Sequence, residues 1–120
     1  MQTGVLNAID DQGLRAYVVW VPILTSDSSP PDEATRALVP DARAMHYWDA
    51  RRALPDLFAP LLQLPPGSPA WDVYLAYPPG VTWEQAPPAP SFWQHQLGDL
   101  ASAPPLDGAS FAAQARELLP

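Results

Sequence analysis

The stretch from Ser68 to Trp83 places the tightest constraint on how this chain can fold. It reads Ser-Pro-Ala-Trp-Asp-Val-Tyr-Leu-Ala-Tyr-Pro-Pro-Gly-Val-Thr-Trp, an apolar run between a leading proline and a Pro-Pro-Gly sequence. Valine and tyrosine favour strands, whereas proline followed by glycine favours a tight turn. The stretch therefore predicts a strand over residues 73–77, a turn at residues 78–80 and a returning strand that begins at Val81.

Two further segments have the composition of strands. Residues 14–24 form a continuous apolar run, which is typical of a strand buried on both faces of a sheet. The predicted strand covers residues 17–21, since Pro22 has no N–H to donate to a ladder. A shorter strand is predicted over residues 45–48. Together these segments predict one central sheet, in which residues 17–21 and 45–48 are parallel and residues 73–77 run antiparallel to both.

Helices are predicted around these strands. Two acids, Asp32 and Glu33, suit the positive end of a short helix, and Asp49 is predicted to cap the helix that follows the second strand. Pro55 and Pro60 are expected to kink or divide that helix. The predicted helical segments are the end of a helix within residues 1–10, a short helix over 32–38, a helix over 50–64, a single turn over 92–97 after a proline-rich connection, and a terminal helix over 107–119. The terminal helix is predicted to carry an apolar stripe of Phe111, Ala112, Ala115, Leu118 and Leu119.

The overall composition suits a single domain over residues 1–120. About half of the residues are apolar and five are tryptophan, so a core can form despite seventeen prolines. The net charge of −7, without any lysine, makes nucleic acid or an anionic membrane an improbable partner.

The chain has no cysteine. Disulfides, thiolate metal sites and cysteine nucleophiles are therefore excluded within it. No segment predicts a transmembrane span or a signal peptide. Since an export signal upstream of Met1 would not be visible here, the compartment stays open.

The order of predicted elements resembles the thioredoxin-like fold family. The order is strand, helix, strand, helix, proline-led hairpin and helix, and it is similar to the peroxiredoxin-like and cytochrome-maturation branch, in which an extra helix and strand are inserted. The resemblance implies an α/β three-layer sandwich whose mixed sheet is flanked by helices. Its motifs are patterns of elements, and it covers nearly the whole chain.

The family's first strand and its Cys-x-x-Cys turn have no counterpart here. In that fold the absent strand is central, between the counterparts of residues 17–21 and 73–77. Two readings stay open: either the natural start lies upstream of Met1, or the domain is shortened and those two strands pair directly. Unpaired edges would otherwise favour self-association.

The resemblance also implies a binding site around Pro69. The family keeps a cis-proline at this position, which exposes the preceding backbone, here that of Ser68, to an extended substrate; a trans proline that starts an edge strand is the alternative. Trp20, Trp48 and Trp71 stand near strand ends that the topology brings to one edge. They are expected either to line a groove for an extended peptide or to pack in the core.

No catalytic residue, metal site or cofactor is predicted. No serine stands in a Gly-x-Ser-x-Gly elbow, no glycine-rich phosphate loop occurs, and His46 and His95 share no ligand spacing. His95 is expected on a solvated turn. The predicted function is a redox-inactive domain that binds an extended peptide or scaffolds a protein partner. The alternatives are a thiol-disulfide oxidoreductase whose cysteine-bearing N-terminus is missing, and a structural module of a larger assembly.

Overall fold

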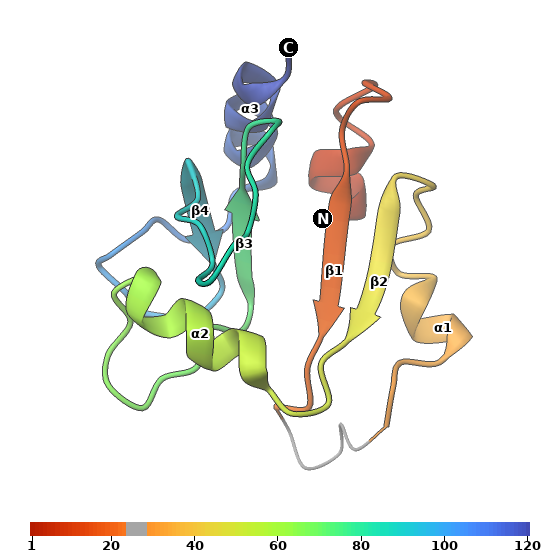
Figure 1. Cartoon of the computed structure of the whole chain (residues 1–120). Helices are drawn as coiled ribbons and strands as arrows, with labels where there is room; N and C mark the ends of the chain where they lie inside the picture. The colour runs from red at the N-terminus through yellow and green to blue at the C-terminus, as the bar shows by residue number, and fades with distance from the viewer. Residues whose placement is uncertain (24–28) are drawn as a thin grey trace.

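The fold combines two small sheets with short helices, as the computed structural model shows (Figure 1). The model describes residues 1–23 and 29–120. The predicted α/β class is confirmed. The elements in chain order are the π-helical turn η1 (Gln2–Leu6), β1 (Ala16–Trp20), α1 (Glu33–Arg36), β2 (Ala44–Trp48), α2 (Ala53–Leu61), β3 (Val73–Ala76), β4 (Phe92–His95) and α3 (Gly108–Leu118).

The first sheet consists of β1 and β2. The two strands are parallel and in register, from Ala16 opposite Ala44 to Trp20 opposite Trp48. A parallel pair needs a crossover connection, and this one includes α1. The predicted parallel pairing is therefore confirmed.

The second sheet consists of β3 and β4, which are antiparallel. The prediction that β3 shares one sheet with β1 and β2 is wrong, because β3 is paired with β4 in a separate ladder. The predicted returning strand at Val81 is also wrong. Val81 and Trp83 lie in an irregular loop and are 42% and 45% exposed. The strand that returns beside β3 is β4 instead.

The partner of β3 comes from the segment that was predicted to be a single helical turn. Phe92 and Trp93 are aromatic and suit a pleated surface, while Pro90 prevents a helix from extending backwards. A lone helical turn would leave most of its backbone groups unpaired, whereas pairing with β3 satisfies them. Tertiary pairing therefore overrides the local helical pattern.

The short helices begin largely as predicted. The N–H of Thr35 donates to Asp32 Oδ1 at 2.8 Å, which caps α1 and lowers the pKa of the Asp32 carboxyl. Asp49 accepts from the Leu54 N–H at 2.9 Å, although Arg52 is the cap residue of α2. The helix α2 is shorter than residues 50–64. It accommodates Pro55 because the first N–H groups of a helix need no partner within it.

The hydrophobic core lies where η1 packs against α3. The buried apolar residues of this cluster are Val5, Ile9, Ala76, Phe111, Ala112 and Ala115. The predicted apolar stripe of the terminal helix is thus confirmed. At the closest approach, a Cβ added to Gly108 would lie 3.0 Å from the Cα of Gly4, so the two backbones meet where neither residue has a side chain.

An arginine joins η1 to the start of β2. The Arg43 guanidinium donates to the carbonyl oxygens of Leu6 at 2.7 Å and of Ile9 at 2.6 Å. It also forms a bidentate pair with Asp41, with an Nη2–Oδ2 distance of 2.7 Å, and this pair lowers the pKa of the Asp41 carboxyl. Since these donors are engaged within the chain, the cluster is structural.

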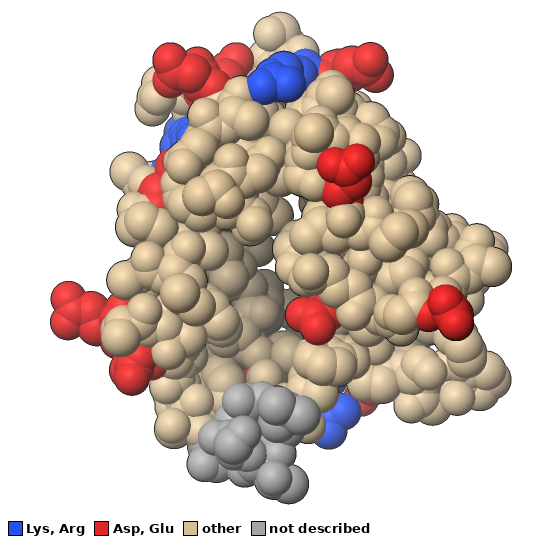
Figure 2. All heavy atoms as spheres, turned by 180° about the vertical axis from the view of Figure 1, so that it is seen from behind, with Lys and Arg blue, Asp and Glu red and all other residues tan. Residues whose placement is uncertain are grey.

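The two sheets stand beside each other without joining. In Figure 1, β1 and β2 run downward and β3 runs upward, so β1 and β3 run in opposite directions across the gap. The space-filling view from behind shows a slit between the half with the first sheet and the half with the second (Figure 2). The slit opens through the molecule in places and is bordered mainly by uncharged residues.

Candidate functional site

Two of the predicted site residues lie together at the end of the first sheet. Trp20 and Trp48 are opposite each other in the ladder, so their side chains share one face. The Trp20 indole N–H donates to His46 Nδ1 at 3.0 Å, and the two rings are stacked with centroids 6.0 Å apart. All three side chains are half-buried, and the bond between Trp20 and His46 gives these two rings a packing role.

The other predicted site residues precede β3. Figure 1 places the start of β3 at the same end of the molecule as the ends of β1 and β2. The peptide bond before Pro69 is trans, so the predicted cis-proline is wrong. Instead, the Ala70 N–H donates to the Pro55 carbonyl at 3.0 Å, which ties this segment to α2, and the Ser68 N–H donates to the Pro65 carbonyl.

The edge of β1 that does not pair with β2 is open. The Ala16 N–H donates to the Arg43 carbonyl and the Trp20 carbonyl accepts from the Asp49 N–H, so the even-numbered residues of β1 direct their backbone groups at β2. Because successive residues of a strand point their backbone groups to opposite sides, Tyr17 and Val19 direct theirs away from β2. No backbone partner for these groups exists in the described chain.

The edge of β3 that does not pair with β4 is open in the same way. The Asp72 carbonyl accepts from the Gln96 N–H at 2.9 Å, which places Tyr74 in a hydrogen-bonded pair with Gln94. The N–H and C=O groups of Val73 and Leu75 therefore point away from β4. Among the described residues nothing pairs with them.

One face of the first sheet is also uncovered. Tyr17, Met45 and Tyr47 project from it and are 65%, 49% and 44% exposed. The ring centroids of Tyr17 and Tyr47 are 6.3 Å apart. Parallel strands are normally covered on both faces, so a bare face on a parallel pair is unusual.

Besides the slit, the described surface has two smaller depressions. One of about 400 Å³ lies beside α2, lined by residues of α2 and the following proline loop, including Asp56, Pro60 and Ser68. Another of about 90 Å³ lies beside Trp20, His46 and Trp48. Neither depression brings together groups for acid–base or nucleophilic chemistry.

Both histidines have their ring nitrogens engaged. His46 accepts at Nδ1 from Trp20 and its Nε2 is 3.0 Å from the Val39 carbonyl. His95 is buried on β4, so the expectation of a solvated turn is wrong; it accepts at Nδ1 from the Leu97 N–H, and its Nε2 is 3.0 Å from the Ala103 carbonyl. Within residues 1–23 and 29–120, no group of three histidine or acidic side chains is arranged to hold a metal.

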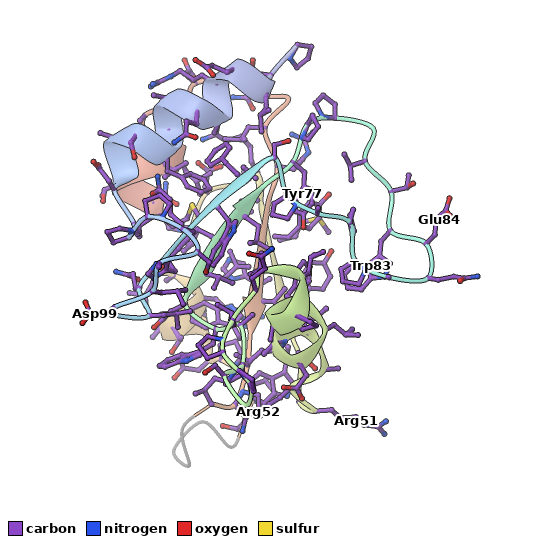
Figure 3. The ribbon with its side chains drawn as sticks, turned by 90° about the vertical axis from the view of Figure 1, so that its left-hand side faces the viewer. Arg51, Arg52, Tyr77, Trp83, Glu84 and Asp99 are labelled. Carbon is purple, nitrogen blue, oxygen red and sulfur yellow. The ribbon has the colours of Figure 1, made fainter. Side chains whose placement is uncertain are left out.

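A proline-rich loop over residues 78–90 lies beside β3 and α2. Figure 3 shows Glu84 on the outer side of this loop, pointing away from the body of the molecule, whereas Trp83 and Tyr77 lie nearer to it. Tyr77 donates its hydroxyl to the Pro88 carbonyl at 2.9 Å, and burial raises the pKa of that hydroxyl. The rings of Trp83 and Phe58 pack edge-to-face, with their centroids 5.7 Å apart. These contacts hold the loop against the body.

The open edges are the feature that sequence reasoning located only in part. The apolar character of residues 17–21 and 73–77 could be predicted from the sequence, and the resemblance implied that these two strands could keep unpaired edges. The residues that present free backbone groups, Tyr17, Val19, Val73 and Leu75, could not be assigned before the pairings of β1 with β2 and of β3 with β4 were known. The register supplied that information.

A comparison of the chain with protein-family models, curated proteins and solved structures returned no match. The described helices are all too short or too polar to span a bilayer.

Proposed function

We propose that this protein is a non-catalytic binding domain that holds an extended polypeptide by strand pairing. The observation that supports the proposal most strongly is the pair of open strand edges, at Tyr17 and Val19 on β1 and at Val73 and Leu75 on β3. Open edges accept an extended chain through its backbone, with little demand on its side chains.

The proposal includes the finer fold. A strand in the slit would complete a thioredoxin-like mixed sheet, of which the two present sheets are the outer parts. This arrangement accounts for the unpaired edge of β1 and for the apolar composition of this strand, Ala-Tyr-Val-Val-Trp, beside the slit. Thiol-disulfide exchange is not part of the proposed function, because the chain has no cysteine to supply the thiolate nucleophile.

Binding of a permanently unfolded model protein with blocked cysteines tests the proposal. Isothermal titration of the 120-residue chain with this probe should give saturable binding, and the native, disulfide-bonded form of the same probe should give none, since only the unfolded form offers free backbone. Equal binding of both forms, or of neither, would refute strand capture.

A further inference from the structure

We infer that the bound segment is inserted between β1 and β3 and pairs with both at once, joining the two sheets into one of order β2, β1, bound strand, β3, β4. The inference rests on the proposed function and specifies its partner. An alternative that uses the same open edges is a strand added to β1 or to β3 alone, as happens at the edge of an ordinary sheet.

The hydrogen-bonding groups favour insertion. The free groups of Tyr17 and Val19 point away from β2, and those of Val73 and Leu75 point away from β4. In Figure 1 these two edges are the ones that face each other across the gap. A strand placed between them offers alternate residues to each side, so every one of these groups gains a partner.

The direction and length of the partner follow from the strands. Because β1 and β3 run in opposite directions, the inserted strand is parallel to one and antiparallel to the other, which makes the completed sheet mixed. The strands β1 and β3 contain 5 and 4 residues, so the paired part of the partner is of that length. An inserted strand would hold its two neighbours about 9.5 Å apart, twice the usual spacing of paired strands.

The electrostatics of the slit define the chemistry of the partner. Neither Ala-Tyr-Val-Val-Trp of β1 nor Val-Tyr-Leu-Ala of β3 contains a charged residue, and the residues that border the slit are mainly uncharged. A charged side chain in the paired segment would lose its hydration without gaining a counter-ion. The partner is therefore a peptide segment of uncharged, strand-forming residues.

Peptides with methylated backbone nitrogens test the inference. The probe is a capped peptide with the centre Val-Ile-Val-Tyr-Val and Gly-Ser-Lys on each side, titrated at about 0.5 M salt, where attraction of its lysines to the acidic chain is screened. Two variants carry N-methyl groups on alternate central residues, one on the odd set and one on the even set. A third carries aspartate at the central position.

Insertion predicts that each methylated set weakens binding by at least about tenfold, because each set removes the donors that serve one neighbouring strand. The aspartate variant should be weakened to a similar extent. If one methylated set binds as tightly as the parent, the peptide pairs on one side only and the insertion is refuted while strand capture stands. If no unmethylated peptide binds, the proposed function itself is refuted.

Discussion

The indole N–H of Trp20 donates to Nδ1 of His46 across the parallel ladder, at 3.0 Å. His46 Nε2 is in turn 3.0 Å from the Val39 carbonyl, which fixes the neutral tautomer with the proton on Nε2. The pair joins β1, β2 and the segment after α1. It gives the first sheet a polar link at the end where its aromatic residues gather.

A double-mutant cycle should measure this link. Trp20→Phe removes the donor and His46→Ala removes the acceptor, and each is expected to lower the free energy of unfolding by about 1–3 kcal/mol. The coupling energy between them should be about 1 kcal/mol, measured by urea denaturation. Strictly additive effects would show that the hydrogen bond does not contribute to stability.

The Arg43 clamp should make the fold sensitive to acid. The guanidinium lowers the folded-state pKa of the Asp41 carboxyl, so the stabilisation is fully present above the ordinary pKa of aspartate, about 3.9, and is lost as the pH falls toward the folded value. Urea denaturation between about pH 6 and pH 2 should therefore show a steeper loss for the wild type than for Asp41→Asn. Parallel pH profiles for the two proteins would contradict this role.

The contact between Gly4 and Gly108 should tolerate no side chain. Gly108→Ala places a Cβ 3.0 Å from the Cα of Gly4, which forces η1 and α3 apart. The expected loss is about 1–3 kcal/mol, even though alanine is the better helix former. The control Gln114→Ala, on the exposed side of α3, should change stability by less than about 0.5 kcal/mol.

Proline at an open edge should block binding without breaking the sheet. The N–H groups of Val19 and Leu75 point away from their ladders, so Val19→Pro and Leu75→Pro remove no ladder bond but remove a donor to the bound strand. Each variant should keep a folded circular dichroism spectrum and bind the unfolded probe at least about tenfold more weakly. The matched variant Val18→Pro loses a bond to β2 and should destabilise the fold.

In the absence of a partner the open edges should promote self-association. Light scattering of the isolated 120-residue chain is expected to show oligomers or poor solubility despite the charge of −7, and peptide addition should shift the population toward monomer. A monodisperse monomer from the 120-residue chain alone would contradict this expectation.

Local patterns were sufficient for some elements. The run before Pro22 predicted β1, acidic caps predicted α1, and the apolar stripe of residues 107–119 predicted α3, because each depends on neighbours in sequence. The strand β4 was mistaken for a helical turn, since Phe92 and Trp93 are satisfied by pairing with β3, which lies far away in the sequence.

The binding site was predicted only in outline. The sequence pointed to strand ends with tryptophan and to Pro69, but the register shows that Trp20 is engaged with His46 and that the bond before Pro69 is trans. The open edges depend on which side of each strand is paired. That property is set by tertiary contacts and leaves no mark in local composition.

Amide hydrogen exchange of the free chain tests the central claim most directly. The claim is that β1 and β3 each keep one unpaired edge, at Val19 and Leu75. The account predicts that these two amides exchange rapidly, while those of Val18 and Tyr74, which bond within the ladders, are protected. If Val19 and Leu75 are protected as strongly as Val18 and Tyr74 in a monomeric sample, the edges are already paired and the binding site does not exist.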